Sequence, residues 1–133
     1  MSTLKVNTIQ DASGGNSSTA EQLQQGRAKA YVNCTGGASV STNSSLSINN
    51  SFNVSSVTDK GTGRHRINFS SAMPNSNLCP VFGFSRSDSN MIVYHDHDDA
   101  KATGYIDIRT TFSWSSGGNL GDTTQLYVAI FGD

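Results

Sequence analysis

The chain has 133 residues, of which 35% are hydrophobic and 14% are charged, and its formal net charge at pH 7 is -1. A near-neutral charge with aromatic residues along much of the chain argues against nucleic-acid binding and against intrinsic disorder, while the length fits one domain with a small core. No apolar stretch is long enough to span a bilayer and no signal-peptide pattern opens the sequence, so membrane insertion is not expected.

The first residues predict a short strand, a turn and a short helix. Apolar and polar residues alternate in the first part of residues 1–17, which indicates an extended strand followed by a Gly-rich turn. Ser18 and Glu21 have the spacing of a capping box, and Gly26 is expected to end the helix in a left-handed conformation. A helix this short needs partners to pack against.

The sequence predicts a β-hairpin over residues 51–73. Phe52 and Val54 alternate with polar residues, so we expect them to share one face of the first strand. The doubled serine before Val57 puts this valine out of step, and a bulge is needed if Val57 is also to reach the core. Glycines within residues 59–63 supply the positive φ of a wide turn.

Four further strands are expected at residues 27–34, 78–84, 105–114 and 125–131. The 105–114 strand has one apolar and one polar face. The 78–84 and 125–131 strands are apolar on both faces, which predicts burial on both sides, within a sheet or between subunits.

Short strands separated by Gly, Ser and Asn turns predict an all-β fold, an antiparallel β-sandwich or Greek-key-like domain with a short N-terminal helical turn. A trimer would bury the two-sided C-terminal strand, so an intertwined trimer is expected. Residues 1–33 are predicted to form an N-terminal trimerisation or attachment segment of strand, turn and short helix. Residues 34–133 are predicted to form the β-sandwich-like domain.

Several sequence motifs point to one family. They are the run Phe-Asn-Val-Ser-Ser-Val-Thr-Asp from Phe52, a strand ending in Asn-Phe and followed by Ala-Met-Pro at residues 72–74, the run Leu-Lys-Val-Asn-Thr-Ile-Gln-Asp from Leu4, and the terminal Ala-Ile-Phe-Gly-Asp. In these motifs the chain resembles the C-terminal region of tail-fibre proteins of marine tailed phages of the cyanophage and pelagiphage type. The likeness covers residues 4–33 and 50–74 well and residues 78–125 thinly.

The resemblance implies a structural protein of a bacteriophage virion. Such a tail-fibre or fibre-tip component would be a homotrimer, would contact other tail or capsid proteins, and would bind a host cell-surface glycan or protein during host attachment. Two alternatives stay open. The chain is either a trimeric capsid decoration or other virion-surface protein, or a stand-alone carbohydrate-binding module outside the virion.

The sequence does not predict an enzyme. It has no nucleophile elbow, phosphate loop, zinc pair or Rossmann signature, and no residue is assigned a catalytic role. Asp96, Asp98 and Asp99 are close in sequence, but fibres that hydrolyse polysaccharides need a longer groove of repeated β coils than this length supplies. Cys34 and Cys79 match no metal spacing and are expected to be buried free thiols.

Receptor contacts are expected in the loops at residues 85–90, 95–104 and 115–122, because soft polar loops on a rigid scaffold often carry binding residues. Tyr94 and Trp114 would serve as stacking platforms for sugar rings, although Trp114 shares strand parity with Ile106 and fits the core as well. The receptor-binding candidates are Arg86, Asp88, Tyr94, His95, His97, Trp114 and Asn119.

His95 and His97 form the one sequence pattern that suggests a metal. On a strand the two imidazoles point to the same face about 7 Å apart, and three copies around a trimer axis would bring together six nitrogen ligands for a transition-metal ion. The simpler interpretation is a solvated loop, in which acidic neighbours raise the pKa values of both histidines. No other cofactor is expected.

Overall fold

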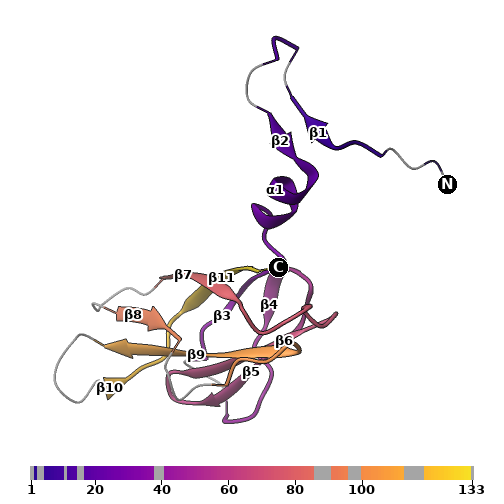
Figure 1. The fold of residues 1–133 in the computed structure, drawn as a ribbon. Coiled ribbons are helices and arrows are strands. Elements are labelled where there is room, and N and C mark those ends of the chain that lie inside the picture. The colour runs from indigo at the N-terminus through magenta and orange to yellow at the C-terminus, as the bar shows by residue number, and fades with distance from the viewer. Residues whose placement is uncertain are drawn as a thin grey trace.

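Backbone hydrogen bonds arrange the strands into two main antiparallel sheets and a small separate ribbon (Figure 1). The structure is a computed structural model that describes residues 2, 5–10, 12–14, 17–37, 41–85, 91–95, 100–112 and 119–132. Its elements are β1 (Thr8–Ile9), β2 (Ser18–Thr19), α1 (Ala20–Gln25), β3 (Ala30–Thr35), β4 (Ile48–Phe52), β5 (Val54–Gly61), β6 (Arg64–Phe69), β7 (Cys79–Ser85), β8 (Met91–Tyr94), β9 (Tyr105–Phe112), β10 (Asn119–Leu120) and β11 (Gln125–Phe131).

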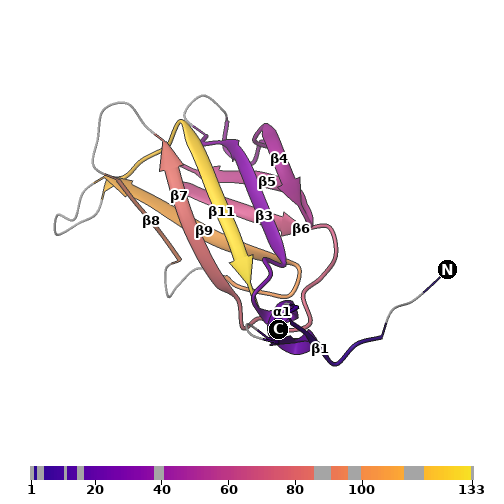
Figure 2. The same cartoon turned by 90° about the horizontal axis from the view of Figure 1, so that it is seen from above.

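The two main sheets pack face to face as a sandwich (Figure 2). One sheet, here called the β9 sheet, has the order β10-β9-β6-β5, with β8 paired to the other edge of β9. The second, the β11 sheet, has the order β4-β3-β11-β7. This arrangement confirms the predicted all-β class and the antiparallel β-sandwich.

Alternate residues of both sheets point inward and form one core. Period-two alternation gives each strand a buried and a more exposed face, so inward residues of the two sheets meet. Each fully buried aliphatic side chain contributes about 1.5–3 kcal/mol to folding. The buried apolar residues are Ala30, Val32, Cys34, Leu46, Val54, Val57, Ile67, Phe69, Met73, Leu78, Ile106, Ile108, Leu126, Val128 and Ile130.

A sharp corner at Asn53 takes the chain from one sheet to the other. Asn53 has a φ of 53°, and its amide nitrogen donates to the carbonyls of Lys29 and Ser71, each at 3.2 Å. Its Oδ1 accepts the Ser71 N–H at 2.8 Å. Phe52 is consequently 50% exposed on the β11 sheet, whereas Val54 is 8% exposed in the core beside the β9 sheet. The prediction that these two residues share one face of one strand is therefore wrong.

Beyond this corner, β5 and β6 form the predicted hairpin. The register shifts between Val54 and Ser56, and this bulge returns Val57 to a fully buried position, as expected. Gly61 and Gly63 have φ values of 118° and 63°, which confirms that the turn uses glycines with positive φ.

The N-terminal helix forms with a different cap from the one predicted. Thr19 is the N-cap: its Oγ1 accepts from the Gln22 N–H at 3.1 Å, and the Gln22 side chain accepts from the Thr19 N–H at 2.9 Å. The predicted pair, Ser18 and Glu21, lies one residue too early, because the helix begins at Ala20 and the residue before it, Thr19, is the N-cap. Gly26 ends the helix with a φ of -72°, so it does not adopt the left-handed conformation expected of it.

The β1–β2 ribbon and α1 form an arm that projects away from the sandwich (Figure 1). The arm joins the body where β3 begins, at the end of the sandwich that also holds the end of β11 (Figure 2). Strand β3 pairs with β4 and β11, so residues 30–33 of the predicted N-terminal segment contribute to the sheet.

The two strands predicted to be buried on both faces differ in their placement. Strand β11 lies between β3 and β7, which confirms a position inside the sheet, but the chain covers only one of its faces: Tyr127 on the other face is 40% exposed. Strand β7 lies at the sheet edge, and none of its residues is fully buried: Phe82 is partly buried against the core, whereas Phe84 and Val81 are 36% and 54% exposed. The predicted burial of both faces is therefore wrong for this strand. Cys79 is also exposed and not buried as expected, whereas burial raises the pKa of the Cys34 thiol to about 12 and keeps it protonated.

Close packing at Gly36 gives a test of the sandwich. A Cβ at this position would lie 2.0 Å from Thr123 Oγ1 and 2.1 Å from the Thr123 carbonyl oxygen. We expect Gly36→Ala to lower the free energy of unfolding by more than about 2 kcal/mol, because the backbone must move to relieve the overlap. Gly104→Ala is the matched control, since a Cβ there meets no heavy atom within 4 Å. Equal urea midpoints for the two variants would contradict this packing.

Candidate functional site

Among the residues that the structure describes, most exposed aromatic side chains of the sandwich lie on the outward side of the β11 sheet. Antiparallel pairing places side chains of opposed residues on the same face, so the register orders them into rows across the sheet. One row is Phe52, Tyr31, Ala129 and Val81, and the next is Asn50, Asn33, Tyr127 and Gly83. Tyr31 and Tyr127 are 39% and 40% exposed.

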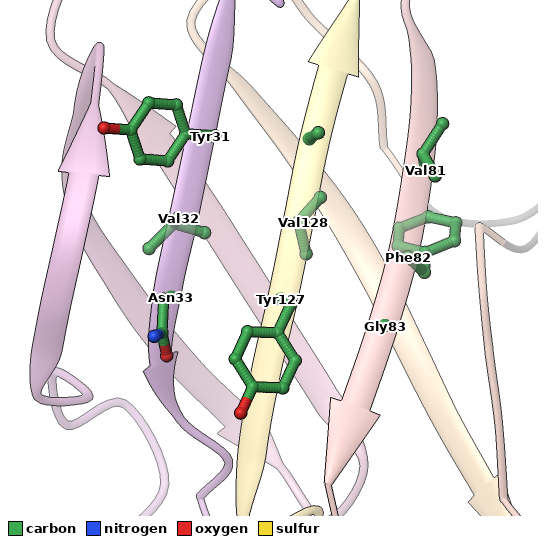
Figure 3. A pocket seen from close by; sticks show the side chains of 9 residues that line it. Tyr31, Val32, Asn33, Val81, Phe82, Gly83, Tyr127 and Val128 are labelled. Carbon is green, nitrogen blue, oxygen red and sulfur yellow. The ribbon is translucent and has the colours of Figure 1, made fainter.

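A groove with a volume of about 360 Å³ lies on this face (Figure 3), and we call it the outer-face groove. Tyr31 on β3, Tyr127 on β11 and Val81 on β7 are its largest outward-pointing lining residues. Ala129 and Gly83 lie between them in the two rows. Because these two residues have at most one side-chain carbon, they leave the surface hollow.

Tyr31 is held in place by its cross-strand neighbour Phe52. The two rings stack with centroids 6.2 Å apart and an interplanar angle of 25°. Such pairs contribute about 0.5–1.5 kcal/mol beyond the area that they bury. The Tyr31 ring is therefore supported from one side and presents its other side to solvent.

Three amide side chains form a cluster beside the groove. Asn49 Nδ2 donates to Asn33 Oδ1 at 3.3 Å and to Gln125 Oε1 at 3.0 Å. A register shift in the β3–β4 pairing after Asn33 makes Asn49 an extra residue of β4 and brings it to this position. Within the described part of the chain, the amide nitrogens of Asn33 and Gln125 donate to no protein group, so their N–H groups can bond another molecule.

The outer face of the β9 sheet is different, because polar groups there bond one another. Arg66 makes a bidentate ion pair with Asp107, with both N–O distances at 2.7 Å. The guanidinium carbon of Arg66 also lies 3.8 Å from the centre of the Tyr105 ring. Asn68 donates to the hydroxyl of Ser56 at 3.0 Å. Arg66, Asp107 and Asn68 thus have partners on their own face, whereas the nine described lining residues of the outer-face groove carry no charge.

The predicted receptor residues that the structure describes lie on the β9 sheet, away from the outer-face groove. Tyr94 ends β8 opposite Arg109 and is followed by His95, while Asn119 begins β10 opposite Phe112. These partners lie three positions apart on β9, or about 10 Å along the strand, so the structure does not bring Tyr94 and Asn119 together.

The other receptor candidates, Arg86, Asp88, His97 and Trp114, lie outside the described residues. The metal hypothesis has the same limit, because only His95 of the His95–His97 pair is described. Among the described residues, no group of three or more His, Cys, Asp or Glu side chains is placed to hold a metal ion. Both the loop contacts and the axial metal stay predictions.

A buried histidine lies beneath the β5–β6 turn. His65 is 1% exposed, and neither of its ring nitrogens has a hydrogen-bond partner among the described residues. Burial lowers its pKa below the ordinary 6.5, although the nearby Asp122 and Asp59 carboxylates act in the opposite direction. Those carboxylates have structural bonds of their own: Asp59 accepts from the Gly61 N–H at 2.8 Å and Asp122 from the Gly63 N–H at 2.7 Å.

This environment predicts a pH-dependent stability. Between pH 6.5 and the lowered pKa of the folded state, the unfolded chain binds a proton at His65 that the folded chain does not bind, so acidification through this window favours unfolding. The contribution approaches about 1.4 kcal/mol per pH unit once the unfolded histidine is charged. Urea unfolding between pH 7.5 and pH 5.5 should give a steeper loss of stability for the wild type than for His65→Gln. Parallel curves for the two proteins would show that the folded histidine titrates normally.

The sequence did not single out the groove residues, although part of the signal was present. Tyr31 stands on the polar face of its strand between Lys29 and Asn33, and an aromatic residue on a polar face is a mark of a binding surface. Tyr127 was not considered as a surface residue, because both faces of the 125–131 strand were expected to be buried. Gly83 and Ala129 carry no signal until the strands are paired.

Comparisons with known proteins do not assign a family. No family model, no curated protein and no solved structure matches the chain. Among the described residues, the helix is too short to cross a membrane. Inferences about function therefore depend on the surfaces described above and on the motifs of the sequence.

Proposed function

We propose that the chain is an adhesive structural protein of a phage virion, a tail-fibre or fibre-tip component that attaches the virion to a receptor on the host cell. The observation that carries this proposal is the uncovered aromatic face of the β11 sheet. Tyr31, Phe52 and Tyr127 are all exposed there, and a cluster of rings on a rigid sheet is typical of recognition surfaces. The resemblance to marine-phage fibre proteins supports the same function.

The arm supports a role in assembly. Val6, Ile9 and Leu23 are exposed on it, and it stands apart from the sandwich (Figure 1). A segment of this length cannot cover its own apolar side chains, whereas three arms around one axis would cover each other. The proposed unit is thus a homotrimer in which the arms associate and contact another tail or capsid protein.

Both alternative functions are compatible with the same surface. The outer-face groove would serve equally well in a carbohydrate-binding module that works outside a virion, and a virion-surface protein on the capsid would also share the trimeric form. The position of the chain in a particle separates these functions, because the groove itself is the same in each.

Association through the arm can be measured directly. Light scattering of the purified chain should give a mass of about three times the 14.1 kDa of one copy. The double variant Ile9→Ser with Leu23→Ser should give a single copy with an unchanged β-sheet circular dichroism spectrum, because both side chains lie outside the sandwich. Gln24→Ser, an exposed polar position on the same arm, is the matched control and should stay trimeric. A wild-type chain that is monomeric at micromolar concentration would contradict the proposed assembly.

Electron microscopy of labelled particles tests the virion role. Gold-labelled antibodies against the sandwich should mark the fibre ends of phage particles whose genome encodes the chain. Label spread over the capsid would favour a decoration protein, and particles without label would favour a module that works outside the virion.

A further inference from the structure

We propose that the outer-face groove binds a neutral glycan, with sugar rings packed on Tyr127 and Tyr31 and sugar hydroxyl groups bonded to the amide cluster of Asn33, Asn49 and Gln125. The inference rests on the proposed adhesive function and names the ligand class and the site. It also moves the receptor contact from the loops of the β9 sheet to the strands of the β11 sheet.

The two tyrosines are placed to act on one ligand. Tyr31 pairs with Ala129 and Tyr127 pairs with Asn33, so the tyrosines are diagonal neighbours on adjacent strands. Diagonal neighbours on one face of an antiparallel pair are about 7–8 Å apart. Both residues line the groove, with the Tyr31 ring leaning toward Phe52 on β4 and the Tyr127 ring lying over β11 (Figure 3), and the apolar faces of the rings suit the C–H groups on the flat side of a sugar ring.

The amide cluster supplies the polar contacts that a sugar needs. A hydroxyl group both donates and accepts hydrogen bonds, and an amide side chain also offers both functions. Asn33 lies directly opposite Tyr127, and Gln125 lies two residues before Tyr127 on the same face of β11. Because Asn33 and Gln125 accept from Asn49, their N–H groups are directed to other acceptors. Stacking surface and hydrogen-bonding groups thus occupy adjoining parts of the face.

The absence of charge in the groove selects neutral sugars. Anionic ligands are commonly held by arginine or lysine side chains, and the nine described lining residues include neither. The groove, with a volume of about 360 Å³, is an open depression of the sheet surface and not an enclosed pocket. The groove itself is almost wholly apolar, so the polar contacts to a sugar must come from the amide cluster beside it.

The test uses the full chain on an array of neutral and anionic oligosaccharides, followed by calorimetry with the neutral oligosaccharide that binds best. The wild type should bind neutral oligosaccharides. Tyr127→Ala should weaken binding by about tenfold or more, whereas Tyr127→Phe, which keeps the ring, should stay within about threefold of the wild type. Tyr94→Ala, on the β9 sheet, should bind as the wild type does.

A second variant tests the groove without removing an aromatic ring. A Cβ on Gly83 would lie 3.6 Å from Tyr127 Cβ, an ordinary contact, so Gly83→Val should fold and fill the hollow. We expect Gly83→Val to lose binding by about tenfold or more while its thermal midpoint and mass in solution stay unchanged. This variant keeps the test valid if Tyr127→Ala is unstable.

Four results would overturn the inference. They are no binding to any neutral oligosaccharide, preference for anionic oligosaccharides, loss of binding in Tyr94→Ala but not in Tyr127→Ala, and dissociation of the trimer in Tyr127→Ala or Gly83→Val. The last result would make the face a subunit interface. Particles labelled at their fibre ends together with no glycan binding would overturn this inference and leave the adhesive function in place.

Discussion

The position of β11 between β3 and β7 is the constraint on which the sandwich depends. Leu126, Val128 and Ile130 point inward from this strand and are fully or almost fully buried. Its two neighbours come from distant parts of the chain, so the β11 sheet closes only when the last strand is in place. Pairing over such sequence separations is slow and costs loop-closure entropy, which the burial of these aliphatic side chains must offset.

The same strand also creates the exposed face. With a period of two, the residues between the buried ones point outward, and in β11 they are Gln125, Tyr127, Ala129 and Phe131. Core and groove are therefore linked through a single register: a slip of one residue would move Tyr127 into the core and Val128 into solvent. This coupling fixes the groove residues on a rigid element, which lowers the entropy cost of binding compared with a mobile loop.

Local patterns in the sequence predicted local structure well. The β5–β6 hairpin, its bulge before Val57 and the buried face of β9 all follow from alternation and glycine placement within a short stretch of chain. The errors arise where distant groups decide the outcome. The corner at Asn53 depends on hydrogen bonds to the carbonyls of Lys29 and Ser71, and the sequence around Asn53 does not predict these partners.

The candidate site could not be derived in the same way, because strand order determines it. Tyr31 and Tyr127 are far apart in sequence and become neighbours only because β3 pairs with β11. The amide cluster needs a further long-range event, the register shift that brings Asn49 beside Asn33 and Gln125. Binding residues are common in loops, so the sequence-based prediction placed receptor contacts there and did not include the strand residues of the candidate site.

The proposed association through the arm would compensate for the low affinity expected of a single groove. A shallow groove with two stacking rings and a few hydrogen bonds supports only modest affinity for one sugar, because hydrogen bonds to exposed groups mostly replace bonds to water. The arm rises from the end of the sandwich where β3 begins, on the same side as the outer face of the β11 sheet (Figures 1 and 2), so in the proposed trimer the three outer faces would lie around the joined arms. Three such faces on one particle tip would engage a repeating glycan together, and each bound groove raises the effective concentration of the next. In the proposed trimer, weak single sites would therefore be sufficient for firm attachment.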